Sequence, residues 1–386
     1  MPRSRRRSPS QKARRFRRPK TPSPTSMRQQ QAKEGAMATT FAAAIRDGLA
    51  TALAVDDDVI CFGLGTDDPK GVFGTTLDLH KQFGPDRVFD MPTSEAAMTG
   101  FAIGAALNGM RPVMTHQRLD FALLSLDQLV NNAAKWRFMF GGKRGVPITI
   151  RMIIGRGWGQ GPTHSQSLQS WFAHIPGLKV VMPTTAEDAK GLLLGAIFDD
   201  DPVIFLEHRW LHNMKGEVPA GDVRSPLGKA RIVRQGDAVT IVAMSYMTVE
   251  ALHAVDHLAA QGIACDLIDL RSIRPLDWPA VIASVQKTGR LLALDSGHLT
   301  GGVAGEIVAR VATDHFASLK SAPQRLAAPD VPEATSPALT KNYHVRAEHI
   351  AEAVGRMLGR EVEIASLVAQ RTFPHDVPGT WFSGPF

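Results

Sequence analysis

The sequence is poor in cysteine and has no long apolar run. Its 386 residues include only Cys61 and Cys265, so at most one disulfide can form. Neither a disulfide-rich secreted scaffold nor a zinc site with paired cysteines is supported, and we expect two reduced thiols in an intracellular protein. No stretch of about 18 apolar residues occurs, so the sequence predicts no transmembrane helix and no membrane partner.

Acidic residues are almost absent from residues 1–36. This segment carries a net charge of +11 against +7 for the whole chain, so residues 37–386 carry −4 and no nucleic-acid partner is predicted for them. Weak contacts of the basic segment itself with nucleic acid remain open. The segment is rich in Arg and Ser, like a transit peptide, but has too few large apolar residues for an amphipathic face. We expect a disordered basic extension, or an upstream start codon with Met37 as the true first residue. The expected location is cytoplasmic, with an organellar matrix as the alternative.

Three phosphate-binding and nucleophile motifs are also missing. The glycine-dense loop at residues 155–161 is not a G-x-G-x-x-G motif, because Gln160 and Pro162 break the spacing. No G-x-x-x-x-G-K-[ST] loop and no G-x-S-x-G elbow occur. A Rossmann-type dinucleotide site, a P-loop NTPase and an α/β-hydrolase are therefore unsupported.

What is present is an alternation of helical and strand-like segments, which predicts an α/β protein with mostly parallel sheets. Helices are predicted at residues 41–55, 95–107, 121–140 and 186–198, with Thr185 as an N-cap, and strands at 59–64, 88–91, 112–115, 147–154, 179–182 and 203–207. After a Gly- and Pro-rich linker at 213–230, strands are predicted at 238–244, 264–269, 290–295 and 324–328, with helices near 248–261, 302–313 and 349–358. We expect two three-layer α/β/α domains, residues 37–212 and 231–360, and a C-terminal tail at 361–386.

Two residues are candidates for chemistry. Glu95 stands where a strand ends and an apolar helix begins, and ligands collect at the carboxyl ends of strands in such sheets. It is equally a glutamate favoured by the helix dipole. His164, at the end of the glycine-dense loop, can transfer protons near neutral pH, or it is an ordinary loop histidine. His208 and His212 have the i, i+4 spacing of metal ligands but no third ligand, so we interpret them as structural.

Several motifs together resemble the beta subunits of the first, decarboxylating component of the pyruvate, branched-chain and acetoin dehydrogenases. The resemblance runs from about Thr40 to Leu358. It rests on Lys-Gln-Phe-Gly-Pro-Asp-Arg-Val (81–88), Ser-Glu-Ala (94–96), Asp-Gln-Leu-Val-Asn-Asn-Ala-Ala-Lys (127–135), His-Ser-Gln-Ser (164–167), Trp-Phe-Ala-His-Ile-Pro-Gly-Leu-Lys-Val-Val (171–181), Asp-Ala-Lys-Gly-Leu-Leu (188–193), Pro-Val-Ile-Phe-Leu-Glu-His (202–208) and Asp-Leu-Arg-Ser-Ile-Arg-Pro-Leu-Asp (269–277). It implies a transketolase-like pyrimidine-binding domain followed by a transketolase C-terminal domain.

The resemblance also implies roles for five residues. Glu95 looks like the carboxylate that hydrogen-bonds N1′ of the aminopyrimidine of thiamine diphosphate. Phe121 looks like the aromatic residue that packs on the pyrimidine, with Gln117 and Thr93 as neighbouring cofactor-binding positions. His164 looks like the histidine that faces the substrate and the lipoyl group.

Two departures from the family pattern concern substrate and metal. Pyruvate-specific members usually carry Phe-Met-Thr-Phe where this chain has His-Gln-Arg-Leu at 116–119, which puts pyruvate itself in doubt. The diphosphate-binding G-D-G motif is absent, and in this family it lies, with its magnesium, on the alpha subunit. No magnesium ligand is therefore expected on this chain. Some members hold a potassium ion, and the corresponding positions here are Ile148, Thr149, Ala196, Asp199 and Asp201.

The resemblance implies a thiamine-diphosphate-dependent 2-oxo acid dehydrogenase of two alpha and two beta chains. The reaction is expected to be oxidative decarboxylation, with the acyl group passed to a lipoyl-bearing acyltransferase. Two alternatives stay open: a split transketolase-like enzyme with a non-lipoyl acceptor, and a catalytically silent assembly subunit.

Overall fold

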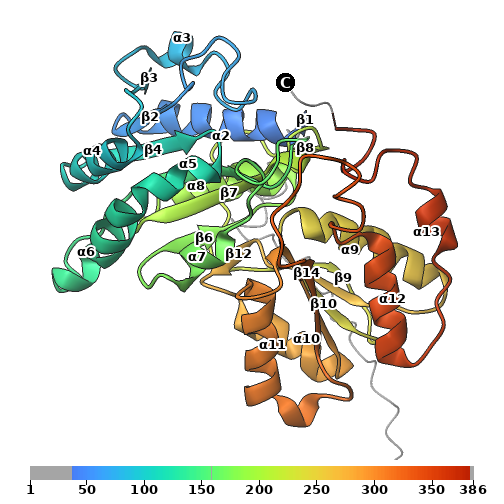
Figure 1. The fold of residues 1–386 in the computed structure, drawn as a ribbon. Helices are drawn as coiled ribbons and strands as arrows, with labels where there is room; N and C mark the ends of the chain where they lie inside the picture. Colours follow the sequence, from blue (N-terminus) through green and yellow to red (C-terminus); the bar gives the residue numbers. More distant parts are fainter. Residues whose placement is uncertain (1–36, 158, 383–386) are drawn as a thin grey trace, which may run out of the picture.

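The structure is a computed structural model that describes residues 37–157 and 159–382. It contains two lobes, each built around its own large sheet, with the chain passing from the upper to the lower lobe in Figure 1. The predicted basic extension, residues 1–36, lies outside the described residues, as do the last four residues of the predicted tail.

The first sheet has seven strands in the order β12-β6-β7-β5-β4-β2-β3. All neighbouring strands are parallel except β12, which runs antiparallel to β6. The strands are β2 (Val59–Gly63), β3 (Val88–Asp90), β4 (Arg111–His116), β5 (Thr149–Ile154), β6 (Lys179–Val181), β7 (Val203–His208) and β12 (Ser272–Arg274).

Helices cover both faces of this sheet. On one face, α2 (Phe41–Val55) and α8 (Ala186–Ile197) share a core with the strands, and on the other lie α4 (Glu95–Leu107) and the segments between Leu119 and Met139. Shorter elements are α3 (Leu79–Phe83), α7 (Gln169–His174) and η3 (Arg209–Leu211). A separate two-stranded sheet pairs β1 (Met37–Thr40) with β8 (Lys215–Val218).

The second sheet has the order β14-β13-β10-β11-β9 and is parallel except for β9. Its strands are β9 (Arg231–Arg234), β10 (Thr240–Ala243), β11 (Asp266–Asp269), β13 (Leu291–His298) and β14 (Gln324–Ala328). One face is covered by α9 (Tyr246–Ala260) and α12 (Ala347–Leu358), the other by α10 (Trp278–Thr288) and α11 (Val303–Asp314). The remaining segments are η4 (Phe316–Ser318) and α13 (Ala365–Ala369).

These two layered units confirm the predicted fold class of α/β/α domains with mostly parallel sheets. One apolar core is continuous through both lobes, because it contains Met98 and Ile150 of the first together with Ile268 and Ile307 of the second. The C-terminal segment returns to the first lobe, where Trp381 Nε1 donates to Trp210 O at 3.3 Å (Figure 1). The lobes are therefore joined by a shared core, a shared strand β12 and the returning segment.

Two threonines that precede helices act as N-caps. Thr185 caps α8 as predicted, since its side chain accepts from Asp188 N at 3.1 Å. Thr40 caps α2 in the same way, accepting from Ala43 N at 3.2 Å. Each hydroxyl satisfies a backbone N–H that has no partner inside the helix.

The predicted helix over residues 121–140 is present as one continuous helical segment, Leu119–Met139, but it is not a regular α-helix. The segment is divided into α5 (Leu119–Ala122), the 3₁₀ turn η1 (Leu123–Ser125), the π-helical turns of η2 (Gln128–Ala133) and α6 (Ala134–Met139). The predicted linker, residues 213–230, is not structureless, because it contains β8, whose partner β1 lies more than a hundred residues earlier.

The two cysteines are free and buried, so no disulfide forms. Burial raises the pKa of the Cys61 thiol to about 11 and that of Cys265 to about 12, which keeps both protonated. Among the described residues, no helix is long and apolar enough to cross a bilayer.

Candidate active site

The carboxyl ends of three parallel strands of the first sheet carry the predicted site residues. Thr93 and Glu95 follow β3, Gln117 and Phe121 follow β4, and His164 follows β5. Because these strands are parallel and lie in one sheet, the segments after them meet at the same edge, where open α/β sheets bind their ligands.

Glu95 is the first residue of α4 and is 6% exposed. Its backbone oxygen accepts from Thr99 Oγ1 at 2.8 Å and from Ser125 Oγ at 3.0 Å, so both its own helix and the next segment fix its position. Its carboxylate makes no hydrogen bond or ion pair with another described residue. The amino end of α4 favours the negative charge, and the carboxylate oxygens still reach solvent although the residue as a whole is buried. A ligand can therefore donate a hydrogen bond to them.

Phe121 and His164 are brought together by the fold. Their ring centroids lie 5.4 Å apart and the ring planes meet at 84°, an edge-on contact between two half-buried side chains. Thr163 Oγ1 lies 3.1 Å from His164 Nδ1 and can fix the orientation of the imidazole. Ser125, which bonds the Glu95 backbone oxygen, lies four residues after Phe121 in the same helical segment, so one segment carries both a contact to Glu95 and the ring that meets His164.

The other two predicted cofactor-binding residues lie at the rim. Gln117 is exposed, and its Nε2 donates to Leu64 O at 3.1 Å, across the loop that follows β2. A side chain at Gly65 would come within 2.7 Å of that nitrogen, so glycine is required for this approach. Thr93 is exposed just before α4.

Sequence reasoning missed three polar residues near His164, namely Arg118, Asp120 and Gln166. Arg118 Nη1 donates to Gly155 O at 2.7 Å, and its Nη2 also bonds Gln160. Gln166 Nε2 donates to Asp120 Oδ1 at 2.6 Å, two residues from His164. For Arg118 a signal was available, because it belongs to the segment 116–119 that departs from the family pattern.

The pKa values of Asp120 and Arg118 are both shifted. Burial raises the pKa of the Asp120 carboxyl, although the Gln166 bond and the nearby charges of Arg118 and His164 oppose it. Burial, with repulsion from Arg209, lowers the pKa of Arg118 to about 10. Arg118 stays cationic near neutral pH, so the site combines a cation and a carboxyl within the reach of His164.

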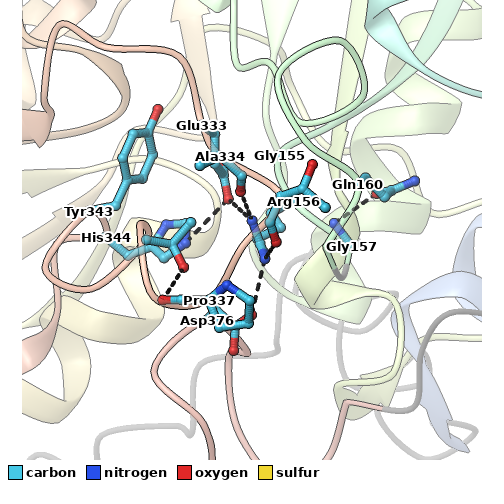
Figure 2. A network of polar contacts seen from close by, with 12 residues as sticks. Gly155, Arg156, Gly157, Gln160, Glu333, Ala334, Pro337, Tyr343, His344 and Asp376 are labelled. Atoms are coloured by element: carbon cyan, nitrogen blue, oxygen red, sulfur yellow. Dashed lines mark hydrogen bonds and ion pairs between the residues drawn. The ribbon is translucent and has the colours of Figure 1, made fainter.

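Behind the His164 loop lies a cavity of about 510 Å³ between the two lobes. Its lining includes Ser165, His208 and residues 295–298, 328–333 and 343–345 of the second lobe. Figure 2 shows Arg156, beside this cavity, in contact with the side chains of Glu333 and Asp376. The loop that carries His164 therefore touches the second lobe directly.

His208 and His212 are buried and serve the structure. His208 Nδ1 accepts from Trp210 N at 3.3 Å and caps η3. His212 Nε2 lies 3.5 Å from Glu207 Oε2, and Glu207 also receives Arg151 Nε at 2.7 Å and Nη2 at 3.1 Å. Burial raises the pKa of Glu207, but the charge of Arg151 and the bonds from His212 and Arg151 outweigh it, so the net shift is downward.

The candidate potassium positions surround the start of β5 and the end of α8. Asp199 accepts from Lys179 Nζ at 2.7 Å, and Asp201 forms an ion pair with Arg137. These carboxylates are already neutralised, so a cation there depends on backbone carbonyls. Within residues 37–157 and 159–382, no group of three or more His, Cys, Asp or Glu is placed to hold a metal ion.

Two domain families match the chain and define its class. Residues 37–214 match "Transketolase, pyrimidine binding domain" and residues 228–350 match "Transketolase, C-terminal domain". A solved structure named "Split gene transketolase, inactive beta4 tetramer" shares the fold, with a TM-score of 0.68 and 24% identity over 85% of this chain and 100% of that chain. The protein is thus of the two-domain transketolase type.

Curated relatives narrow this class. The chain is 44% identical to the "Acetoin:2,6-dichlorophenolindophenol oxidoreductase subunit beta" of Cupriavidus necator, over 77% of this chain and 88% of that protein. It is 40% identical to the protein of the same name from Bacillus subtilis, over 82% and 96%. It is 41% identical to the "Pyruvate dehydrogenase E1 component subunit beta" of Bacillus subtilis, over 75% and 90%. The chain belongs to the family of beta subunits of thiamine-diphosphate-dependent 2-oxo acid dehydrogenases, which confirms the resemblance.

The residues at the site fit the aminopyrimidine end of that cofactor. Glu95 is largely buried and its carboxylate has no partner among the described residues, which suits a ring N–H donor. The half-buried Phe121 ring offers a flat apolar surface at the same edge of the sheet.

Proposed function

We propose that this chain supplies half of an active site that an alpha subunit completes in an assembly of two alpha and two beta chains. The reaction is the oxidative decarboxylation of a 2-oxo acid, with transfer of the acyl group to a lipoyl group on an acyltransferase. The observation that carries the proposal is the unpartnered carboxylate of the largely buried Glu95, at the same edge of the sheet as the Phe121–His164 pair.

Each residue has a separate task in this proposal. Thiamine diphosphate supplies the electron sink that decarboxylation requires. Glu95 holds a proton at N1′ of the aminopyrimidine, Phe121 packs on that ring, and Gln117 and Thr93 line its edge. His164, on the far side of Phe121, transfers a proton as the acyl group passes to the lipoyl sulfur.

The rest of the cofactor belongs to the partner. The alpha subunit holds the diphosphate and its magnesium, since this chain has no G-D-G motif. A potassium ion at the backbone of residues 148–149 and 196–201 is a further part of the proposal. The proposed location is cytoplasmic.

The test is to co-express this chain with its alpha partner and measure two activities with a panel of 2-oxo acids beginning with pyruvate. One is reduction of 2,6-dichlorophenolindophenol, and the other is acylation of a lipoyl domain. Glu95→Gln should lower both rates by about 100-fold or more, because the retained side-chain shape no longer holds the proton. Glu217→Gln, an exposed glutamate in β8, is the matched control.

The outcomes separate this proposal from its alternatives. A Glu95→Gln assembly with full activity contradicts the assignment. Dye reduction without any acylation of a lipoyl domain indicates a split transketolase-like enzyme with another acceptor. No activity in the wild-type assembly, together with no cofactor binding, indicates a silent assembly subunit.

A further inference from the structure

Arg156 is a fully buried arginine near the start of the loop that carries His164, directly after Gly155. Its Nη1 donates to Glu333 Oε1 at 3.1 Å, and its Nη2 donates to Asp376 Oδ2 at 3.0 Å (Figure 2). The same two nitrogens also donate to Ala334 O at 2.8 Å and Thr335 O at 3.3 Å. One guanidinium therefore joins three segments that are far apart in the sequence: the His164 loop, residues 333–335 and the C-terminal segment.

The glycines of the loop allow it to lie flat on residues 333–335. A side-chain carbon at Gly159 would come within 3.1 Å of Thr335 O, and one at Gly161 within 2.4 Å of Thr335 Oγ1. Gly161 also has a φ of +78°, which favours glycine in its own right. The glycine-dense pattern thus reflects close contact with the second lobe.

The C-terminal segment is itself firmly held. Arg346 Nη2 donates to His375 O at 2.8 Å and to Val377 O at 2.9 Å, on both sides of Asp376. Tyr246 Oη donates to Pro378 O at 3.3 Å. The backbone on both sides of Asp376 is therefore fixed. The charge-assisted bond from Arg156 to the Asp376 carboxylate in turn fixes the position of the guanidinium.

The opposite side of the loop is attached to the first lobe. Gly155 N donates to Gln166 O at 3.1 Å and closes the neck of the loop, while Arg118 donates to Gly155 O. His164 lies just inside this neck, on the side that faces Phe121. The first lobe holds the loop at its neck, and Arg156, directly beside the neck, attaches it to residues 333–335 and to Asp376.

We propose that Arg156 is a positioning residue that places His164 through ion pairs to Glu333 and Asp376, so that the second lobe and the C-terminal segment set the geometry of the active-site loop. This inference rests on the proposed function, in which His164 takes part in acyl transfer. The Arg156 side chain is fully buried, and the contacts described above are all to other residues of this chain.

Lysine is the informative substitution at this position. Arg156→Lys keeps the positive charge. Unlike the planar guanidinium, the compact ammonium of lysine cannot bond two carboxylates and two carbonyls at the same time. A loop displaced by a fraction of an ångström misplaces His164, and small misplacements of reacting groups cost about tenfold or more in rate. Dye reduction, which needs no lipoyl group, should change much less. Asp376→Asn, which keeps the shape of the side chain, should give a smaller effect of the same kind and serves if the lysine variant folds poorly.

The experiment is a double-substitution cycle in the assembled alpha–beta complex, with pyruvate or the best acid of the panel and a lipoyl domain as the acceptor. Arg156→Lys should lower lipoyl acylation by about tenfold in the wild-type background and by less than about twofold in the His164→Gln background. Arg271→Lys is the matched control, because Arg271 Nη1 makes a buried pair with Asp188 Oδ1 at 2.9 Å that also joins the lobes and does not contact the loop. Its effect should be the same in both backgrounds.

Hydrogen exchange of the same complexes tests the positioning without reference to activity. Arg156→Lys should raise exchange in residues 157–166 and leave residues 266–274 unchanged. Equal losses in both backgrounds, wild-type acylation by Arg156→Lys, or unchanged loop exchange would overturn the inference. A wild-type rate for His164→Gln, with raised loop exchange in Arg156→Lys, would instead contradict the proposed role of His164 while leaving the positioning of the loop intact.

Discussion

Mild acidification should destabilise the chain through His208, and the size of the effect follows from its burial. Burial, reinforced by the positive groups His344, His212, Arg118 and Arg346, lowers the pKa of His208 from its ordinary 6.5 to about 3. Below 6.5 the unfolded chain takes up a proton that the folded chain refuses, so stability is lost as the pH falls and the loss continues down to about 3. Between about pH 7.5 and about pH 5.5 the contribution is about 1.4 kcal/mol.

The measurement is the free energy of unfolding in urea at both pH values, for wild type and His208→Asn. Asparagine keeps an oxygen that can accept from Trp210 N, and it cannot titrate. The pH dependence of the variant should be smaller than that of wild type by about 1.4 kcal/mol, whatever constant loss the substitution causes. His174→Asn, at an exposed histidine, is the control and should leave the pH dependence unchanged. An identical pH dependence for wild type and His208→Asn would refute the reasoning.

Three further predictions concern packing and caps, all read from urea unfolding. Thr185→Ala should cost about 1 kcal/mol because it leaves a first-turn N–H of α8 without its acceptor, and no change in midpoint would contradict the cap. Arg151→Met should cost about 3–5 kcal/mol because Glu207 stays charged and buried without its partner, and the double variant with Glu207→Leu should recover part of the loss. Gly177→Ala should cost at least about 2 kcal/mol, since its φ is +100° and the added carbon would lie 1.8 Å from a backbone oxygen; an unchanged midpoint would show that the backbone there can move.

Regular elements with strong local signals were predictable. The apolar spacing of α2 and α4 gives their exact limits, Phe41–Val55 and Glu95–Leu107. Buried parallel strands such as β5 are largely apolar, with Arg151 as the charged exception, and their β-branched runs are visible without any partner. These signals are local, so the sequence alone contains them.

Elements fixed by distant contacts were not predictable. The turns η1 and η2 interrupt a run with good helical periodicity, and the bond from Ser125 to Glu95 that fixes this region joins residues 30 positions apart. The three-residue strand β12 forms a strand only because β6 of the other lobe pairs with it. Periodicity contains no information about either contact.

The site divides in the same way. Glu95 was predictable as a candidate because it stands where a strand ends and an apolar helix begins, and His164 because it ends a glycine-dense loop after a strand. The family resemblance added Phe121. The clamp on Arg156 was not, since its partners Glu333 and Asp376 lie 177 and 220 positions further along the chain. An arginine between glycines in a loop is ordinarily a solvated residue.

The most direct test of the central claim is calorimetric titration of thiamine diphosphate with magnesium, first into this chain alone and then into the chain assembled with its alpha subunit. The account predicts tight, magnesium-dependent binding only in the assembly, because this chain supplies Glu95 and Phe121 but no diphosphate motif. Tight binding by this chain alone would contradict the shared site.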